Sequence, residues 1–123
     1  MKYHIENALT VNVVDEIFVP YKDPDQLKAA IAKQPVSVLV DAGSSEFYTY
    51  ESGVLDGPSC GSYVNHAVLA VGYGIEDGLE YYLVKNSWGP YWGDNGYIKI
   101  SITPGFGTCA IQFGPSYPIT DDK

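Results

Sequence analysis

Long hydrophobic runs are missing from this sequence. No stretch of about 18 consecutive apolar residues occurs among its 123 residues, so we expect no membrane-spanning helix. Residues 1–10 are mixed polar and lack the apolar segment of a secretory signal peptide, so none is expected. An N-glycosylation sequon is also missing, because Asn86-Ser87-Trp88 fails at its third position. The sequence therefore predicts no membrane partner.

Basic residues are scarce. Seven Lys and Arg stand against fifteen Asp and Glu, which gives a formal net charge of −8 and a pI near 4.4. Nucleic acids and anionic membranes are poor partners for such a protein because like charges repel. The charge is compatible with a secreted or vacuolar protein and with many other kinds of protein.

Cysteine is rare, with only Cys60 and Cys109 in the chain. Their wide separation differs from the C-x-x-C spacing of zinc and redox motifs, so we expect no metal and no cofactor. From these residues alone, the pair could be two free buried thiols or one disulfide. A disulfide would indicate an oxidising compartment and contribute about 4 kcal/mol to stability.

The residues that are present predict a single globular domain over residues 1–123. Hydrophobic residues make up 46% and charged residues 18%, which suits a packed core and argues against disorder. Eleven tyrosines and thirteen glycines favour strands joined by tight turns. Residues 41–63 are expected to form an irregular connection. The predicted strands are residues 10–19, 36–40, 64–73, 80–85, 97–102 and 110–113.

One helix is predicted, from Asp23 to Gln34. Asp23 can cap the first turn, Pro24 suits the first helical position, and Gln26 can reach back as in a capping box. Pro35 is expected to end the helix. One helix followed by an antiparallel, barrel-like sheet gives an α+β fold class that is mostly β.

Histidine is nearly absent as well, with only His4 and His66. His4 lies between Lys2 and Glu6, a position typical of a solvated side chain. His66 lies in the apolar segment 64–73, where a histidine is by itself more often a satisfied core residue than a catalyst. A second segment, further along the chain, changes this interpretation.

That segment is residues 86–97, Asn-Ser-Trp-Gly-Pro-Tyr-Trp-Gly-Asp-Asn-Gly-Tyr. It resembles the asparagine signature of papain-like cysteine proteases. Residues 65–74, Asn-His-Ala-Val-Leu-Ala-Val-Gly-Tyr-Gly, resemble the family's histidine signature in the wording of cathepsin H-like, cathepsin C-like and plant papain-like enzymes. Tyr117-Pro118 resembles the family's terminal Tyr-Pro, so the resemblance extends from about Leu27 to the C-terminus.

The resemblance implies an acid–base role for His66. A thiol with a pKa of about 8.5 is mostly protonated at working pH, so the family's histidine takes its proton and later protonates the leaving amine. By the same resemblance, Asn86 orients the imidazole through a hydrogen bond. Trp88 matches the tryptophan that shields this bond from water and lines the primed side of the cleft. Without the resemblance, Asn86 would be interpreted as a turn residue at a strand end.

Substrate selectivity is implied by the same resemblance. Leu39, Ala42, Val64 and Gly114 match the S2-lining positions of the family, with apolar walls and no acid at the base. We therefore expect a preference for bulky apolar or aromatic P2 side chains, with Arg disfavoured. Asn65 stands where many relatives have Asp, which is expected to alter pH dependence and primed-side preference without abolishing the chemistry.

The two cysteines match the family's disulfide in this half of the fold, so a bridge between Cys60 and Cys109 is the expected state. Residues 60–63, Cys-Gly-Ser-Tyr, superficially resemble the nucleophile motif Cys-Gly-Ser-Cys-Trp. Tyr63 stands where the nucleophile would be, and these residues precede a predicted strand instead of opening a helix. This segment is therefore not interpreted as a nucleophile site.

The family's helical half has no counterpart in these 123 residues. That half supplies the nucleophilic cysteine and the glutamine of the oxyanion hole. The resemblance therefore implies that residues 1–123 are the C-terminal, β-rich half of a papain-like peptidase, inactive alone.

Three interpretations of such a half remain. It can be one chain of a split peptidase whose helical partner carries the cysteine, a truncated fragment, or a non-catalytic binding module. The first implies peptide or protein substrates, and cystatin-like or propeptide inhibitors as further partners. It also implies a lysosomal, vacuolar or secreted location, where a disulfide persists.

Overall fold

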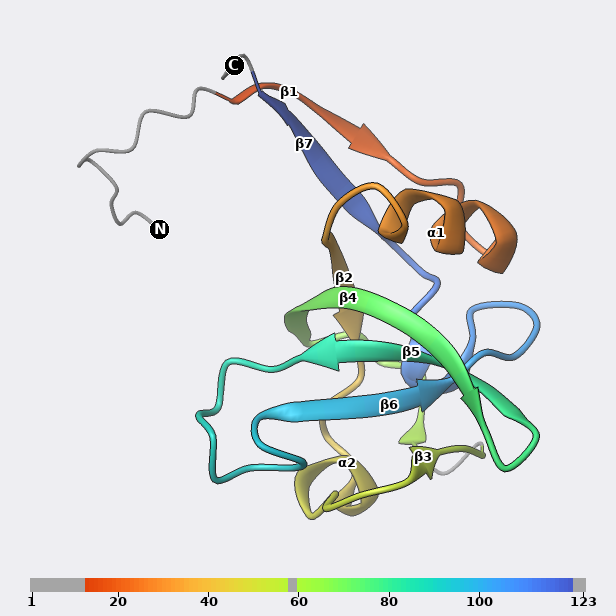
Figure 1. Cartoon of the computed structure of the whole chain (residues 1–123), viewed down its shortest axis with the longest axis vertical. Helices are drawn as coiled ribbons and strands as arrows, with labels where there is room; N and C mark the ends of the chain where they lie inside the picture. Colours follow the sequence, from red (N-terminus) through yellow and green to blue (C-terminus); the bar gives the residue numbers. More distant parts are fainter. Residues whose placement is uncertain (1–12, 58–59, 121–123) are drawn as a thin grey trace.

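The computed structural model describes residues 13–57 and 60–120, which form one sheet with helices at its margins (Figure 1). The strand order is β1-β7-β2-β4-β5-β6-β3. The elements in chain order are β1 (Val13–Phe18), α1 (Pro24–Ile31), β2 (Val36–Val40), α2 (Ser45–Tyr48), β3 (Val54–Leu55), β4 (His66–Glu76), β5 (Leu79–Lys85), β6 (Tyr97–Ser101), a 3-10 turn (Thr108–Ala110) and β7 (Ser116–Thr120).

The predicted fold class, α+β and mostly β, is confirmed, but two of its details are wrong. The sheet is not closed into a barrel, because its order runs from β1 at one edge to β3 at the other. In Figure 1, β1 and β7 form a paired arm at one end, and α2 and β3 lie at the opposite end. The second error concerns residues 41–63, where the short helix α2 and the strand β3 interrupt the expected irregular connection. None of the described helices is long and apolar enough to cross a membrane.

Helix α1 begins where the sequence predicts. The Asp23 carboxylate accepts a hydrogen bond from the Gln26 backbone N–H at 3.1 Å, which satisfies one of the free donors of the first turn. Leu27 and Ile31 are buried and hold the helix against the sheet. The helix ends at Ile31, before the predicted end, and a turn completes the connection to β2.

The strand predicted at residues 110–113 is wrong. Cys109 and Ala110 have φ angles of 57° and 60°, and left-handed residues interrupt a strand. This segment is a 3-10 turn followed by a further turn, stabilised by hydrogen bonds such as Phe113 N–H to Ala110 O at 3.0 Å. The final strand is β7, which sequence analysis did not predict.

The central strands separate a core face from an open face. On β2, Val36, Val38 and Val40 are fully buried, whereas the alternating Ser37 and Leu39 are only partly buried. On β4, which pairs with β2, the same alternation leaves residues 67 and 69 exposed. The sheet therefore carries one open face beside the start of β4.

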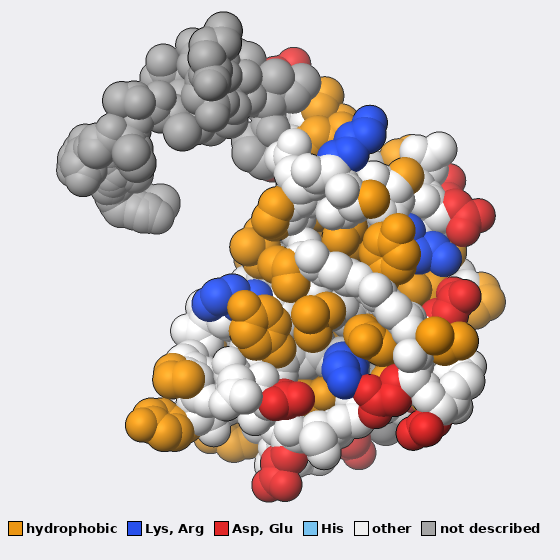
Figure 2. Space-filling model, in the orientation of Figure 1, with side chains coloured by type: hydrophobic (Ala, Val, Ile, Leu, Met, Phe, Trp, Pro, Cys, Tyr) orange, Lys and Arg blue, Asp and Glu red, His pale blue; other side chains and the backbone are white. Residues whose placement is uncertain are grey.

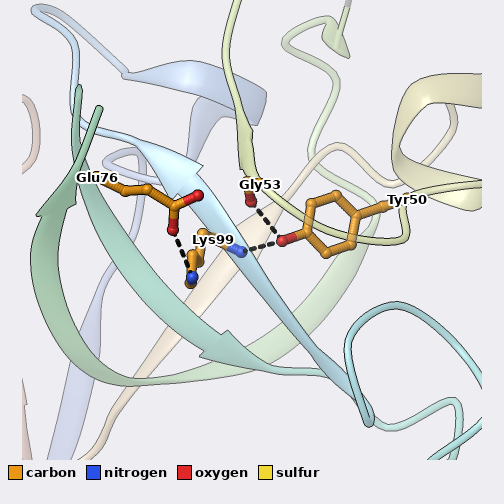
Figure 3. A network of polar contacts seen from close by, with 4 residues as sticks. All are labelled: Tyr50, Gly53, Glu76 and Lys99. Carbon is orange, nitrogen blue, oxygen red and sulfur yellow. Dashed lines mark hydrogen bonds and ion pairs between the residues drawn. The ribbon is translucent and has the colours of Figure 1, made fainter. Parts of the chain in front are cut away.

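A polar network stabilises the opposite end of the sheet (Figure 3). The Tyr50 hydroxyl donates to the Gly53 carbonyl and accepts from the Lys99 backbone N–H at 3.3 Å. The Lys99 ammonium also pairs with Glu76 at 2.6 Å. Burial raises the pKa of Tyr50. The network joins the segment after α2 to β6 and β4.

Lysine side chains lie between hydrophobic ones over β4, β5 and β6, on the face shown in Figure 2. The ammonium of Lys85 lies 5.9 Å from the Tyr97 ring centroid, and that of Lys99 lies 5.3 Å from the Tyr81 centroid. Such cation–π contacts cover part of the aromatic surface. Lysine side chains therefore cover part of the Tyr97 and Tyr81 rings on this face.

Gln112 fixes the segment that follows β6. Its buried amide oxygen accepts from the Tyr82 hydroxyl at 2.8 Å, and its amide nitrogen donates to the carbonyls of Thr103 and Gly105 at 3.0 and 2.8 Å. Burial raises the pKa of Tyr82 well above its usual range. The contacts hold residues 103–112 as a compact loop.

Replacing Tyr82 by phenylalanine is expected to lower the free energy of unfolding by about 1–2 kcal/mol, because the buried Gln112 oxygen loses its donor.

The stability of the wild type is expected to fall as pH rises above about 10. Burial raises the pKa of Tyr82 in the folded chain, so ionisation of this tyrosine favours the unfolded chain. The variant should lose less stability over the same range. Urea unfolding at pH 8 and pH 11 measures both effects. Tyr91→Phe, at a fully exposed position, is the control. An unchanged stability at pH 8 would contradict the prediction.

Candidate active site

His66 and Asn86 come together at the ends of two central strands of the sheet. His66 is the first residue of β4, and Asn86 follows Lys85, the last residue of β5. Because these strands are antiparallel neighbours, the start of one lies beside the end of the other (Figure 1). The His66 Nε2 atom lies 2.7 Å from the Asn86 Oδ1 atom. Asn86 is only 4% exposed, and His66 is half-buried.

This hydrogen bond selects the tautomer of the imidazole. The Asn86 Oδ1 atom also accepts from the Ser87 backbone N–H at 2.7 Å, so the amide oxygen is fixed as an acceptor. Nε2 of His66 must then carry the proton, and Nδ1 carries the lone pair in the neutral ring. Nδ1 is therefore the atom that can accept a proton from a reacting group.

Trp88 covers the His66–Asn86 pair. Its ring stacks on the His66 imidazole with centroids 5.1 Å apart and an interplanar angle of 27°. Its edge packs against Phe47 of α2, which is fully buried, and against Trp92. The Trp92 indole N–H donates to the Tyr48 carbonyl at 2.9 Å. Helix α2 thus supports Trp88, a contribution that no local sequence pattern reveals.

The loop between β5 and β6 projects from the sheet in Figure 1, and hydrophobic side chains protrude there in Figure 2. Its base is closed by the Asn86 N–H donating to the Gly96 carbonyl at 3.0 Å. Gly93 has a φ of 63°, and a Cβ there would lie 2.7 Å from the Tyr97 carbonyl oxygen. Glycine is therefore required for the turn that holds Asn86 and Trp88 in place.

The four residues predicted to line a specificity pocket lie beside the start of β4. A Cβ built on Gly114 would be 3.4 Å from the Leu39 Cδ1 atom, so these two positions are neighbours. The Ala42 N–H donates to the Asn65 Oδ1 atom at 3.0 Å. Val64, which is half-buried, immediately precedes Asn65. Leu39 belongs both to this group and to the open face of the sheet, so the two surfaces adjoin.

Cys60 and Cys109 form a disulfide, and both are buried. The chain therefore has no free thiol, since these are its only cysteines. Residues 60–63 cannot supply a nucleophile for the same reason. Among the described residues, no group of three or more His, Cys, Asp and Glu side chains is placed to hold a metal ion.

A histidine hydrogen-bonded to a buried asparagine and stacked under a tryptophan is the arrangement that the sequence resemblance predicts for a papain-like cysteine peptidase. The chain belongs to the papain family of cysteine proteases, whose family model matches residues 2–119.

Curated relatives include the cysteine proteinase RD21A of Arabidopsis thaliana, which is 44% identical over 120 residues. That match covers 96% of this chain and 26% of the relative. The KDEL-tailed cysteine endopeptidase CEP2 of the same plant is 49% identical over 116 residues, covering 93% of this chain and 32% of the relative. The chain thus spans about a quarter to a third of the length of these relatives.

Solved structures of the family share the fold. The bromelain protease of Ananas comosus, solved in complex with the E64 inhibitor, has a TM-score of 0.82 and 40% sequence identity. This similarity covers 89% of this chain and 51% of the bromelain chain. The proform of the ragweed pollen allergen Amb a 11 has a TM-score of 0.87 and 36% identity, covering 97% of this chain and 37% of that one.

Proposed function

We propose that this chain is the C-terminal, histidine- and asparagine-bearing part of a papain-like cysteine peptidase that hydrolyses peptide bonds. The observation that carries the proposal is the 2.7 Å contact between His66 Nε2 and Asn86 Oδ1, stacked under Trp88, in a member of this family. The nucleophilic cysteine and the oxyanion-hole donors come from a second, helical part of the peptidase, and this chain alone is inactive.

In the proposed reaction, Nδ1 of His66 accepts the proton of the cysteine thiol. The thiolate attacks the substrate carbonyl carbon and forms a tetrahedral intermediate. The imidazolium returns its proton to the leaving amine as the C–N bond breaks, which leaves a thioester on the cysteine. Water, deprotonated by the same imidazole, then attacks the thioester and releases the acid and the thiol.

Asn86 and Trp88 serve this proton transfer indirectly. A neutral amide holds the ring without placing a second negative charge beside the imidazolium. Trp88 excludes water from the hydrogen bond, which strengthens it in a medium of lower dielectric constant. These are the roles that the family resemblance assigns to both residues.

The open sheet face is proposed as the surface that meets the helical part. It forms a depression of about 340 Å³, lined in part by Ala67, Leu69 and Lys85 and reaching Asn86. The Asn86 Nδ2 group is buried and has no hydrogen-bond partner among the described residues. Because a buried unpaired donor is costly, an acceptor from the docked part is favoured here. The coverage of about half of the bromelain chain supports the same arrangement.

Leu39, Ala42, Val64 and Gly114 are proposed to form much of the S2 pocket. Leu39 and Val64 would supply its apolar walls, Gly114 lies beside Leu39, and none of the four residues is an acid. Bulky apolar or aromatic P2 side chains are therefore preferred in the proposed peptidase. Peptides and proteins are its substrates, and cystatin-like or propeptide inhibitors its regulators. The disulfide favours a lysosomal, vacuolar or secreted compartment.

The test is to combine the chain with a purified helical half that carries the cysteine, and then to add a fluorescent epoxysuccinyl probe. We expect the probe to label the helical half only in the complex, with peptide hydrolysis appearing at the same stoichiometry. Bromelain labelled in parallel verifies the probe. A complex that forms without labelling or hydrolysis would contradict the peptidase and favour a binding module.

Asn65→Asp is expected to change the pH–rate profile of this complex. The carboxylate can still accept from the Ala42 N–H and adds a negative charge in the residue next to His66. Because that charge favours the imidazolium, activity should extend to higher pH. Peptide hydrolysis measured from pH 4 to pH 9 tests this, with Asn65→Gln as a neutral control. Superimposable profiles of wild type and Asn65→Asp would rule the effect out.

A further inference from the structure

A buried carboxylate next to the proposed S2 pocket has no part in the chemistry described above. Asp41 follows the last residue of β2 and is 8% exposed. None of the ion pairs found among the described residues includes it. A buried carboxylate without a cation must be stabilised by hydrogen bonds, so its partners reveal its role.

Both oxygens of this carboxylate accept from backbone N–H groups in two different segments. Oδ1 accepts from Gly43 at 2.9 Å, and Oδ2 accepts from Tyr63 at 2.8 Å. Gly61 lies so close that a Cβ there would be 2.5 Å from Oδ2, and its φ is 89°. The Asp41 side chain therefore joins segment 41–43 to segment 61–63. The carboxylate lies so close to the backbone that position 61 has room only for glycine.

The backbone of Asp41 contacts a third segment. Its N–H donates to the Cys109 carbonyl at 2.8 Å, beside the disulfide. The segment that continues from Cys109 leads to Gly114, the proposed base of the pocket. One residue thus lies between the three segments that carry Ala42, Val64 and Gly114.

We propose that Asp41 is a positioning residue that sets the distance between the walls of the S2 pocket and thereby determines P2 selectivity. The inference rests on the proposed function, because the pocket belongs to that site. Ala42 is the next residue after Asp41, and Val64 is the next after Tyr63. The Asp41–Tyr63 bond therefore acts directly between the two walls.

The catalytic pair is held independently of this residue. His66 is fixed by the β2–β4 ladder opposite Val40 and by its bond to Asn86. Loss of the carboxylate is thus expected to affect pocket width more than proton transfer. An asparagine at position 41 keeps the shape but places an NH₂ group against one of the two N–H donors, which breaks one link.

The experiment compares Asp41→Asn with wild type in the complex of this chain and its cysteine-bearing half. Active sites are counted with the epoxysuccinyl probe, and kcat and KM are measured for substrates that differ only at P2. We expect kcat/KM to fall roughly tenfold for P2 Leu and Phe and less than about threefold for P2 Ala. Tyr50→Phe, which removes a hydroxyl from the remote network in Figure 3, should reduce all three rates equally or not at all.

Amide hydrogen exchange on the isolated chain gives a second readout. Asp41→Asn should accelerate exchange at Gly43, Tyr63 and Ala42 and leave the β5–β6 ladder unchanged. Unchanged exchange at these three amides overturns the proposal, as does an active complex with an unaltered P2 profile. A wild-type complex that neither labels nor hydrolyses refutes the proposed function, and the pocket role of Asp41 with it.

Discussion

Replacing His66 by alanine is expected to lower kcat/KM of the assembled peptidase by about 10⁴-fold or more. At the acidic to neutral pH of such enzymes, a thiol with a pKa of about 8.5 is mostly protonated unless a base takes its proton. His66 is the proposed base for this step, since the bond from its Nε2 to Asn86 leaves the lone pair on Nδ1. The variant should also lose nearly all labelling by the epoxysuccinyl probe.

Asn86→Ala tests whether the amide acts through the histidine. Alone it should lower kcat/KM by about 10²-fold, because the ring loses its fixed tautomer and orientation. In the double variant, the second change should add almost nothing to His66→Ala, since residues that act as a unit are not additive. Steady-state kinetics of the three variants measure this. If the rate losses of the two single variants multiplied in the double variant, a positioning role for Asn86 would be contradicted.

A folding control accompanies both substitutions. His66 is half-buried, so its removal is not expected to unfold the chain, and complex formation with the helical half should persist. Binding is measured by size-exclusion chromatography before any rate is compared. Full labelling of a His66→Ala complex would refute the assignment of His66 as the base.

Removing the disulfide is expected to have the largest effect on stability. The bridge joins residues 49 apart, and closing a loop of that length contributes about 4 kcal/mol in the chain-entropy treatment. A domain of this size is stable by only about 5–15 kcal/mol, so the loss is a large share of the total stability. The variant with Cys60→Ala and Cys109→Ala together should therefore show a much lower urea midpoint.

Reductant provides the matched control. Dithiothreitol should destabilise the wild type by a similar amount and leave the doubly substituted variant unchanged, because that variant has no bridge to reduce. Urea unfolding followed by tryptophan fluorescence gives all four values. A wild type that keeps its midpoint in reductant would show that packing around the two buried sulfurs, and not the covalent link, stabilises this region.

Much of the fold follows from local sequence. The cap at Asp23, the short apolar run over Val36–Val40 and the turn before Tyr97 each involve neighbouring residues, so their pattern predicts the element directly. Residues 110–113 show the limit of such patterns. This mostly apolar segment suits a strand, but the left-handed backbone at Cys109 and Ala110, beside the disulfide, turns the chain instead.

The candidate site also depends partly on local sequence and partly on the tertiary structure. The sequence by itself determined the family resemblance, the residues His66, Asn86 and Trp88, and the lack of a nucleophile, because long motifs and cysteine counts are properties of the chain alone. Only the tertiary structure decided which imidazole nitrogen faces Asn86, that α2 supports Trp88, and that the sheet stays open. It also revealed Asp41, whose partners Gly43, Tyr63 and Cys109 come from three segments. Contacts between segments distant in sequence depend on how the strands pair, and no local pattern encodes that pairing.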